Sequence, residues 1–226
     1  MLVANIVLVG TSHIAKQSVH EVDAAIEKYD PALIAIELDR PRLEGLLHPR
    51  KQKMSLRDIR NIGMTGYVFS LIGAWAEKHM GGQVGMKPGA DMLRAVKVAQ
   101  AKKIPVALID QDIGITLKRL SKEVTWKEKG RFVIDIIKGL VARDKKLPFD
   151  LRTVPTQDVI DMLIKEVRKR YPNVYRVLVA ERNDVMAQRL ARLSKKEPER
   201  KIVAIIGAGH EQEMATLIRR YLTTSI

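Results

Sequence analysis

The sequence predicts an α/β protein in which a mainly parallel β-sheet core is flanked by helices, with a large helical insertion between the third and last core strands. Four apolar runs without hydrophobic alternation are typical of strands buried on both faces. Helical patterns separate these runs, as expected for parallel strands joined by crossover helices. The four runs are residues 6–9, 33–36, 105–109 and 202–206.

The N-terminal part of the chain carries a strand, helix and strand unit. The first run, 6–9, is followed by His13, and apolar residues at helical spacing then predict a helix over residues 17–29. The second run, 33–36, ends directly before Glu37. Because the strands of such a unit are parallel and end at one edge of the sheet, we expect Glu37 to lie beside His13.

We expect one domain over residues 1–226, because a chain of this length can bury a core without a metal ion or disulfides. The helical patterns between the third and last runs are interrupted by prolines and contain no convincing strand. The sheet core is expected from residues 1–40, 86–120 and 200–226, and helical segments from 41–85 and 121–198.

The composition narrows both the chemistry and the partners. The chain has no cysteine, so a metal ion must be held by His, Asp, Glu or backbone oxygen. The net charge of +14 would suit nucleic acid, but aromatic residues make up only 4% of the chain, too few for base-stacking platforms. We therefore expect no nucleic-acid partner. The charge suits an anionic membrane surface or an acidic partner equally well.

Two observations bear on localisation. Met1 leads straight into the first strand, without the basic and apolar regions of a signal peptide. The longest uncharged stretch, residues 61–76, is shorter than a membrane-spanning helix requires. We expect a cytoplasmic protein, or the soluble part of a membrane-anchored one.

Polar side chains follow all four apolar runs. Charged groups at the end of an apolar sheet need pairing or a metal ion, because desolvation otherwise costs several kcal/mol per ion. Two histidines and a carboxylate form a three-ligand set for a hydrolytic metal ion with one position open for water. The ligand types allow zinc, manganese or cobalt. The four residues are His13, Glu37, Asp110 and His210.

A metal-free mechanism uses the same residues, with one histidine as a general base oriented by Glu37. The glycines near the strand ends let the backbone approach a ligand and open helix N-termini, so they could hold an anion. They are not a dinucleotide fingerprint, and no P-loop Gly-Lys-Ser/Thr is present, so no nucleotide cofactor is expected. Together with Ser12 and Asp110, the pocket would include Gly10, Gly207 and Gly209.

Five motifs resemble the TraB/PrgY family, which includes Tiki-like proteins. Their order and spacing agree with that family over nearly the whole chain. The paired Gly-x-x-His motifs, together with a strand-end glutamate and arginine, carry the resemblance. The motifs are Gly-Thr-Ser-His at 10–13, Ile36-Glu37-Leu38-Asp39-Arg40, Met86-Lys87-Pro88-Gly89-Ala90-Asp91-Met92, Glu181-Arg182-Asn183-Asp184 and Gly207-Ala208-Gly209-His210.

The resemblance implies a group containing proposed metal-dependent peptidases of the Tiki type and bacterial proteins that shut down peptide pheromone signalling. It also implies a distant similarity to erythromycin esterase-like hydrolases. Two positions depart from the family pattern: Asp91 replaces a glutamate, and Asp110-Gln111 replaces an Asp-Arg pair, so an arginine is missing. By position, the active-site set carried over is His13, Glu37, Arg40, Glu181, Arg182 and His210.

The resulting hypothesis is a metal-dependent hydrolase, a peptidase acting on peptides or membrane-associated proteins. His13, His210 and Glu37 would hold the ion. Asp91 or Glu181 would activate water, and Arg40 and Arg182 would meet a developing oxyanion or a substrate carboxylate. The alternative is a non-catalytic protein that uses the same pocket to bind or sequester a peptide or pheromone, or that acts as a shutdown regulator.

The uncharged stretch 61–76 has three readings: a buried core helix, a subunit interface, or a helix lying on a membrane surface. Glycines at positions 63, 66 and 73 would allow helices to approach closely. Since a two-fold interface needs only one self-complementary patch, we expect a homodimer.

Overall fold

A computed structural model describes residues 1–11, 16–48, 59–71, 89–141 and 157–224. Within these residues the chain is a mixed α/β protein and mostly helical, which confirms the coarse prediction of the fold class. Of the predicted site residues, Ser12 and His13 lie outside the described residues, as do Gly73 and Trp75 of the uncharged stretch.

The sheet of the described residues has the strand order β1-β2-β5-β3-β4. The β2–β5, β5–β3 and β3–β4 pairs are parallel, and the short β1 runs antiparallel to β2. The strands are β1 (Leu2–Val3), β2 (Ile6–Thr11), β3 (Leu33–Ile36), β4 (Val106–Leu108) and β5 (Ile202–Gly207). In the parallel register Thr11 lies opposite Gly207, and Ile36 lies opposite both Ile205 and Leu108. The carboxyl ends of the parallel strands therefore meet at one edge.

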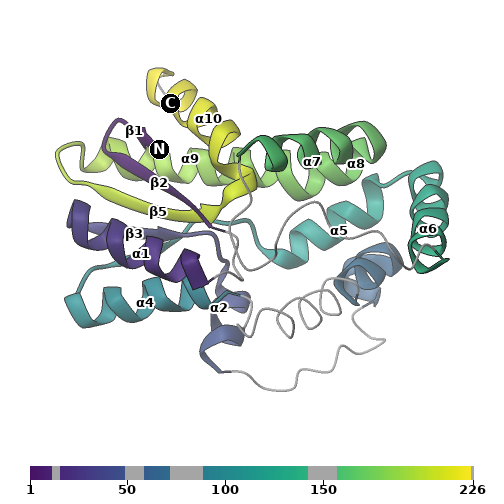
Figure 1. Cartoon of the computed structure of the whole chain (residues 1–226), viewed down its shortest axis with the longest axis horizontal. Helices are drawn as coiled ribbons and strands as arrows, with labels where there is room; N and C mark the ends of the chain where they lie inside the picture. The colour runs from purple at the N-terminus through teal and green to yellow at the C-terminus, as the bar shows by residue number, and fades with distance from the viewer. Residues whose placement is uncertain (12–15, 49–58, 72–88, 142–156, 225–226) are drawn as a thin grey trace.

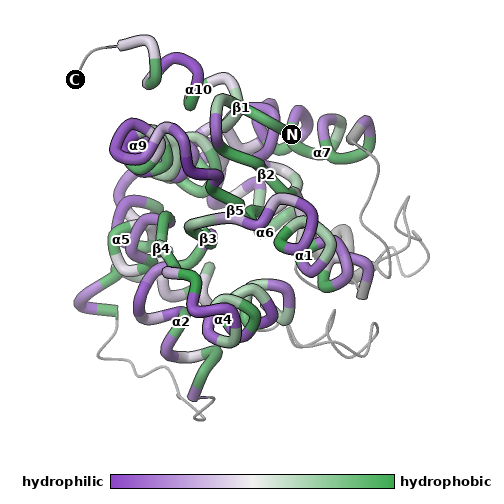
Figure 2. Tube along the Cα trace, turned by 90° about the vertical axis from the view of Figure 1, so that its left-hand side faces the viewer, coloured by the Kyte–Doolittle hydropathy of each residue, from purple (hydrophilic) through white to green (hydrophobic). Residues whose placement is uncertain are grey.

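Helices cover both faces of the sheet (Figure 1). On one face, α9 (Glu181–Lys196) and α10 (Glu211–Thr223) pack against Leu8, Ala204 and Ile206. On the other, α1 (Lys16–Tyr29) and α4 (Ala90–Lys102) pack against Val7, Val203 and Ile205. Figure 2 shows the strands between these two layers. Alternate residues of each strand thus face different layers, so both must be apolar, which explains the uninterrupted apolar runs.

The carboxyl ends of the strands point toward the side of the molecule that carries four further helices (Figure 1). Three of them are long, α5 (Ile113–Glu123), α6 (Trp126–Val141) and α7 (Gln157–Arg170), and one is short, α8 (Pro172–Tyr175). Leu120, Val124, Val174 and Val177 form a third apolar cluster there, separate from those on the two faces of the sheet, and Phe69 packs against it. The short helix α2 (Arg40–Leu47) follows β3 and begins at the N-cap Asp39.

The described part of the uncharged stretch belongs to a helical segment, residues 59–71, that packs on α5. The Ser121 hydroxyl donates to the Ile62 carbonyl (2.6 Å) and accepts from the Gly66 N–H (2.5 Å). A Cβ at Gly66 would lie 2.5 Å from the carbonyl oxygen of Leu117. Gly63 has a φ of +76°, and a Cβ there would lie 2.7 Å from the Ser121 side chain. Two of the three glycines therefore have a packing role inside the chain, and the homodimer stays a prediction.

None of the described helices is long and apolar enough to cross a membrane.

Candidate functional site

Three chain segments converge on the carboxylate of Glu37, which follows β3 and is 6% exposed. Its Oε2 accepts a hydrogen bond from the Gly207 N–H at the end of β5 (2.6 Å). Its Oε1 lies 2.5 Å from Nη2 of Arg182 on α9 and 3.2 Å from Nε2 of His210. Arg182 follows Glu37 by 145 residues in the sequence, and His210 follows it by 173. Both nevertheless contact the same oxygen atom, Oε1 of Glu37.

The turn after β5 places His210. A short 3-10 turn, η2 (Ala208–His210), connects β5 directly to α10. Gly10, at the end of β2, lies so close to this turn that a Cβ there would be 3.1 Å from the Ala208 Cα and 2.6 Å from a Glu211 carboxylate oxygen. On the other side, Ile164 of α7 lies 3.3 Å from where a Cβ of Gly209 would be. These glycines therefore allow β2, η2 and α7 to pack closely around the strand ends.

Arg182 joins Glu37 to Asp110, which follows β4. Its Nε and Nη2 donate to the two carboxylate oxygens of Asp110 (3.0 and 2.6 Å). Arg42 of α2 donates to the same Asp110 (2.5 Å) and to Asp39 (3.0 Å). The side chains of Glu37 and Asp110 are 5% and 0% exposed. Burial lowers the pKa of the Arg182 guanidinium, but the charge of Glu37 and the hydrogen bonds with Asp110 raise it by more, so its pKa is above the ordinary value.

Arg40 lies apart from this network. Its side chain is 85% exposed and pairs with Glu44 at 3.4 Å. Arg42 reaches Asp110 instead, because residues i and i+2 of a helix point about 200° apart. Asp110, which is followed by Gln111 where the family pattern has an arginine, thus pairs with the guanidinium groups of Arg42 from α2 and Arg182 from α9.

A π-helical turn, η1 (Arg176–Ala180), directly precedes the predicted Glu-Arg-Asn motif. Such turns inside helices occur frequently at functional sites. After this turn Arg182 and Asn183 face Glu37 and His210, whereas Glu181 forms a two-pronged ion pair with Arg119 of α5 (2.5 and 3.0 Å). Of the charged residues in this motif, Arg182 therefore contacts the strand ends and Glu181 contacts α5.

A series of hydrogen bonds fixes the Nδ1 side of the His210 ring, whereas Nε2 faces Glu37. Its Nδ1 lies 2.5 Å from Oδ1 of Asn183, which is completely buried. The Nδ2 of Asn183 donates to Oε2 of Glu213 (3.0 Å), and the Tyr175 hydroxyl donates to the same oxygen (2.8 Å). We call these three residues, Asn183, Glu213 and Tyr175, the His210 support.

Sequence reasoning did not identify Arg42, Glu213 or Tyr175, and it assigned Asn183 no role. One local signal was available for Glu213. It lies three residues after His210, in the first turn of α10, where two such positions share a helix face. Nothing local in the sequence relates Tyr175 or Arg42 to the strand ends.

Tyr175 gives a pH-dependent prediction. Burial, followed by the hydrogen bond to Glu213, raises the pKa of its phenol to about 12. The unfolded phenol ionises at about 10, so between these values the unfolded state holds fewer protons than the folded state. We expect the free energy of unfolding of the wild type to fall, relative to Tyr175→Phe, as pH rises from about 9.5 to about 11.5. Urea denaturation at several pH values measures this difference; parallel curves would contradict it.

Asp91 lies at the end of β2 and is 1% exposed. It is in the first turn of α4, and its Oδ2 accepts a hydrogen bond from the Thr11 hydroxyl (2.5 Å). Thr11 is the last residue of β2, two positions before His13 in the sequence. Asp91 is thus held against the strand that leads to the first Gly-x-x-His histidine.

The residues fit part of a metal site. Two ligand atoms on a tetrahedral zinc ion, each at about 2.1 Å, are about 3.4 Å apart. Nε2 of His210 and Oε1 of Glu37 are 3.2 Å apart, close to that spacing. Among the described residues, no group of three or more His, Asp or Glu side chains could hold an ion, and His13, the expected third ligand, is outside them.

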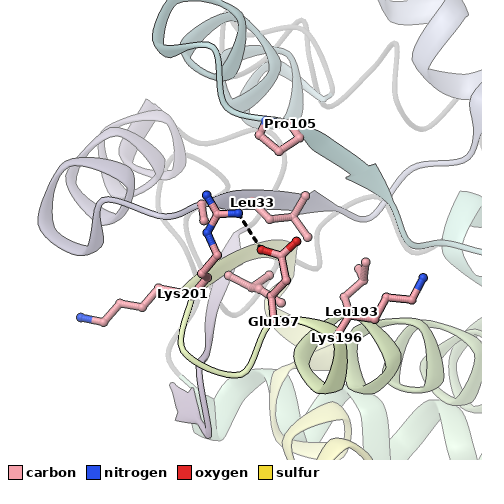
Figure 3. A pocket seen from close by; sticks show the side chains of 9 residues that line it. Leu33, Pro105, Leu193, Lys196, Glu197 and Lys201 are labelled. Atoms are coloured by element: carbon pink, nitrogen blue, oxygen red, sulfur yellow. Dashed lines mark hydrogen bonds and ion pairs between the residues drawn. The ribbon is translucent and has the colours of Figure 1, made fainter.

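A cavity of about 220 Å³ lies at the opposite end of the sheet (Figure 3). Leu33, Pro105, Leu193 and Ile202 give it apolar walls, and an ion pair between Arg200 and Glu197 (2.8 Å) lies at its rim. Because Leu33 and Ile202 begin β3 and β5, this cavity is separate from the cluster around Glu37, which follows the carboxyl ends of the strands.

The fold and the cluster define an α/β protein with a buried glutamate, and a largely buried histidine and arginine, where the parallel strands end. A model of the TraB/PrgY/gumN family matches residues 3–219, so the chain belongs to this family. That match confirms the resemblance in the sequence motifs.

Relatives extend the same comparison. An uncharacterized protein of Methanocaldococcus jannaschii is 35% identical over 219 residues, which are 96% of this chain and 54% of that protein. The human TraB domain-containing protein is 24% identical, over 92% of this chain and 61% of its own length, and the mouse protein is 23% identical. The chain thus spans little more than half the length of these relatives.

Proposed function

We propose that this chain is a metal-dependent hydrolase that cleaves peptides or membrane-associated proteins. The observation that supports it best is the approach of His210 Nε2 to Glu37 Oε1 at 3.2 Å, where the strands end. In parallel α/β sheets this edge is where ligands bind. A largely buried histidine and a buried carboxylate at ligand spacing are the donor types that zinc, manganese and cobalt accept.

Glu37 and His210 would hold the ion together with His13. Bound there, the ion would lower the pKa of a coordinated water and polarise a carbonyl group. Asp91 is the residue we assign to accept a proton from that water, because it lies at the end of β2 beside Thr11. Glu181 suits this role less, since both of its oxygens accept hydrogen bonds from Arg119.

Arg182 would supply positive charge next to the reacting carbonyl. It stays protonated because its pKa is raised, and it is fixed by Glu37 and Asp110. A preorganised guanidinium of this kind can stabilise a developing oxyanion without reorganising. Arg40, which is largely exposed, would at most meet a distant part of a substrate.

One observation favours the second candidate, a non-catalytic module that binds peptides. Both oxygens of Glu37 already have partners, the Gly207 N–H and the Arg182 guanidinium. Arg182 would compete with an ion for Oε1, and a pocket neutralised in this way could hold a peptide without cleaving it. The homodimer and the membrane-surface contact expected from residues 61–76 are further proposals that do not depend on this choice.

Elemental analysis and product analysis together test the proposal. Protein purified without added metal, and after addition of manganese, cobalt or zinc, is analysed for bound ion and incubated with a peptide library for mass spectrometry. The variants are His13→Ala and His210→Ala, with the exposed His20→Ala as the matched control. We expect metal-dependent cleavage in the wild type and His20→Ala only. Intact but bound peptides would support the binding module, and absence of metal from every preparation would refute the hydrolase.

A further inference from the structure

The His210 support forms a directional chain of hydrogen bonds. An ionised carboxylate can only accept, so Glu213 is the acceptor for both Tyr175 and Asn183. The raised pKa of Tyr175 keeps its hydroxyl a donor throughout the physiological range. Oε2 of Glu213 is therefore the acceptor for two donors, the Tyr175 hydroxyl at 2.8 Å and the Asn183 amide at 3.0 Å.

The direction of the chain determines the orientation of the Asn183 amide. Its NH2 group faces Glu213, so its carbonyl oxygen must face His210, where it lies 2.5 Å from Nδ1. A carbonyl oxygen accepts and cannot donate, which means that Nδ1 of His210 carries the hydrogen. The side chain of Asn183 is fully buried, so water does not compete for this contact.

We propose that Asn183 is a positioning residue that, held by Glu213 and Tyr175, fixes His210 as the Nδ1–H tautomer with the lone pair of Nε2 directed at Glu37. In the other tautomer Nε2–H would donate to Glu37, and the two residues would form an ordinary hydrogen bond. In the fixed tautomer two acceptor atoms, Nε2 of His210 and Oε1 of Glu37, face each other at 3.2 Å, a spacing that a cation between them would bridge.

This inference deepens the proposed function and, in its metal-binding part, rests on it. A ligating histidine needs its lone pair on the atom that meets the ion, and the partner of its other nitrogen sets which atom that is. Asn183 would hold that lone pair in place before any ion binds, so that no tautomer exchange accompanies binding. The tautomer itself can be observed without metal, independently of any hydrolysis.

Long-range ¹H–¹⁵N NMR of the metal-free protein at about pH 9.5, where an ordinary imidazole is neutral, identifies the tautomer. The His210 signals are assigned with His210→Gln. We expect Nδ1–H in the wild type and in Asn183→Asp, which keeps an acceptor, and mixed tautomers in Asn183→Leu. The matched control is Asn173→Leu, which removes an amide that donates to Glu128 at 2.8 Å; its His210 should remain Nδ1–H.

Cobalt titration of the same proteins gives the second measurement. We expect the affinity for Co²⁺ to fall about 10- to 100-fold in Asn183→Leu and to stay near that of the wild type in Asn183→Asp and Asn173→Leu. Glu213→Gln, which lets the Asn183 amide turn over, keeps the inference testable if Asn183→Leu does not fold, and it should also show mixed tautomers.

Three results would overturn the inference: a bare Nδ1 in the wild type, an imidazolium that persists at about pH 9.5, or an unchanged tautomer in both Asn183→Leu and Glu213→Gln. Failure of the proposed function looks different. In that case the wild type would show the fixed Nδ1–H tautomer and its dependence on Asn183, yet bind no Co²⁺.

Discussion

Replacing Arg182 with leucine is expected to lower the free energy of unfolding by about 3–5 kcal/mol, because it leaves buried carboxylates without their partner. Glu37 loses its guanidinium entirely, and Asp110 keeps one guanidinium, that of Arg42, and the hydrogen bond from the Gln111 N–H. The two carboxylates are 5% and 0% exposed, so water cannot replace the lost hydrogen bonds. Thermal and urea denaturation followed by circular dichroism measure the loss. At about 2–4 °C per kcal/mol, the melting temperature should fall by about 6–20 °C.

Arg119→Leu is the matched control for that variant. Arg119 also makes a two-pronged ion pair, with Glu181, but it is 40% exposed. Exposed pairs contribute about 0–1 kcal/mol because water solvates the separated charges well. An equal loss of stability in both variants would show that burial of the Glu37, Arg182 and Asp110 network is not what stabilises the protein.

The sheet was predictable because its strands leave a strong local signal. Each strand lies between two helical layers, so residues such as Val203 and Ala204 are apolar although they face opposite sides. Strand ends were predictable for the same reason, since an apolar run that stops at Glu37 or near His210 marks the sheet edge. The structure brings these two residues within 3.2 Å. Their pairing with Arg182 could be expected only from the resemblance to the family, because 145 residues separate Arg182 from Glu37.

Helix phase limited what could be predicted of the site. Arg40 and Arg42 are two positions apart, and only the cap at Asp39 decides which of them faces Asp110. The π-helical turn before Glu181 has the same effect, since an irregular turn shifts the facing of every residue after it. Neither feature has a dependable signal in a single sequence.

Close contacts between distant segments were the other limit. Glycines in the uncharged stretch suggested approach by a second copy of the chain, whereas Gly66 approaches the Leu117 carbonyl of α5. The same sequence pattern serves both kinds of contact, because a missing side chain allows any neighbour to come near. The side on which the neighbour lies is a property of the tertiary structure.

If the proposed function holds, replacing Glu37 with glutamine should lower both the affinity for the metal ion and the rate of hydrolysis by at least about 100-fold. The amide keeps the size of the side chain and can still accept from the Gly207 N–H, but it offers an ion no negative charge. Arg182 retains Asp110, so the fold should persist and can be verified by circular dichroism.

The control for Glu37→Gln is Glu128→Gln, a buried carboxylate, 3% exposed, that accepts hydrogen bonds from Thr125 and Asn173 in the helical part of the chain. This variant removes the same charge from a part of the chain far in sequence from the strand ends. We therefore expect it to lower the free energy of unfolding without changing metal affinity or turnover. If Glu37→Gln still bound metal and cleaved peptides as the wild type does, the carboxylate would not be a ligand. Of these two carboxylates, only Glu37 lies within ligand spacing of His210 Nε2. If both variants lost activity together, the effect would therefore come from general destabilisation rather than from the site.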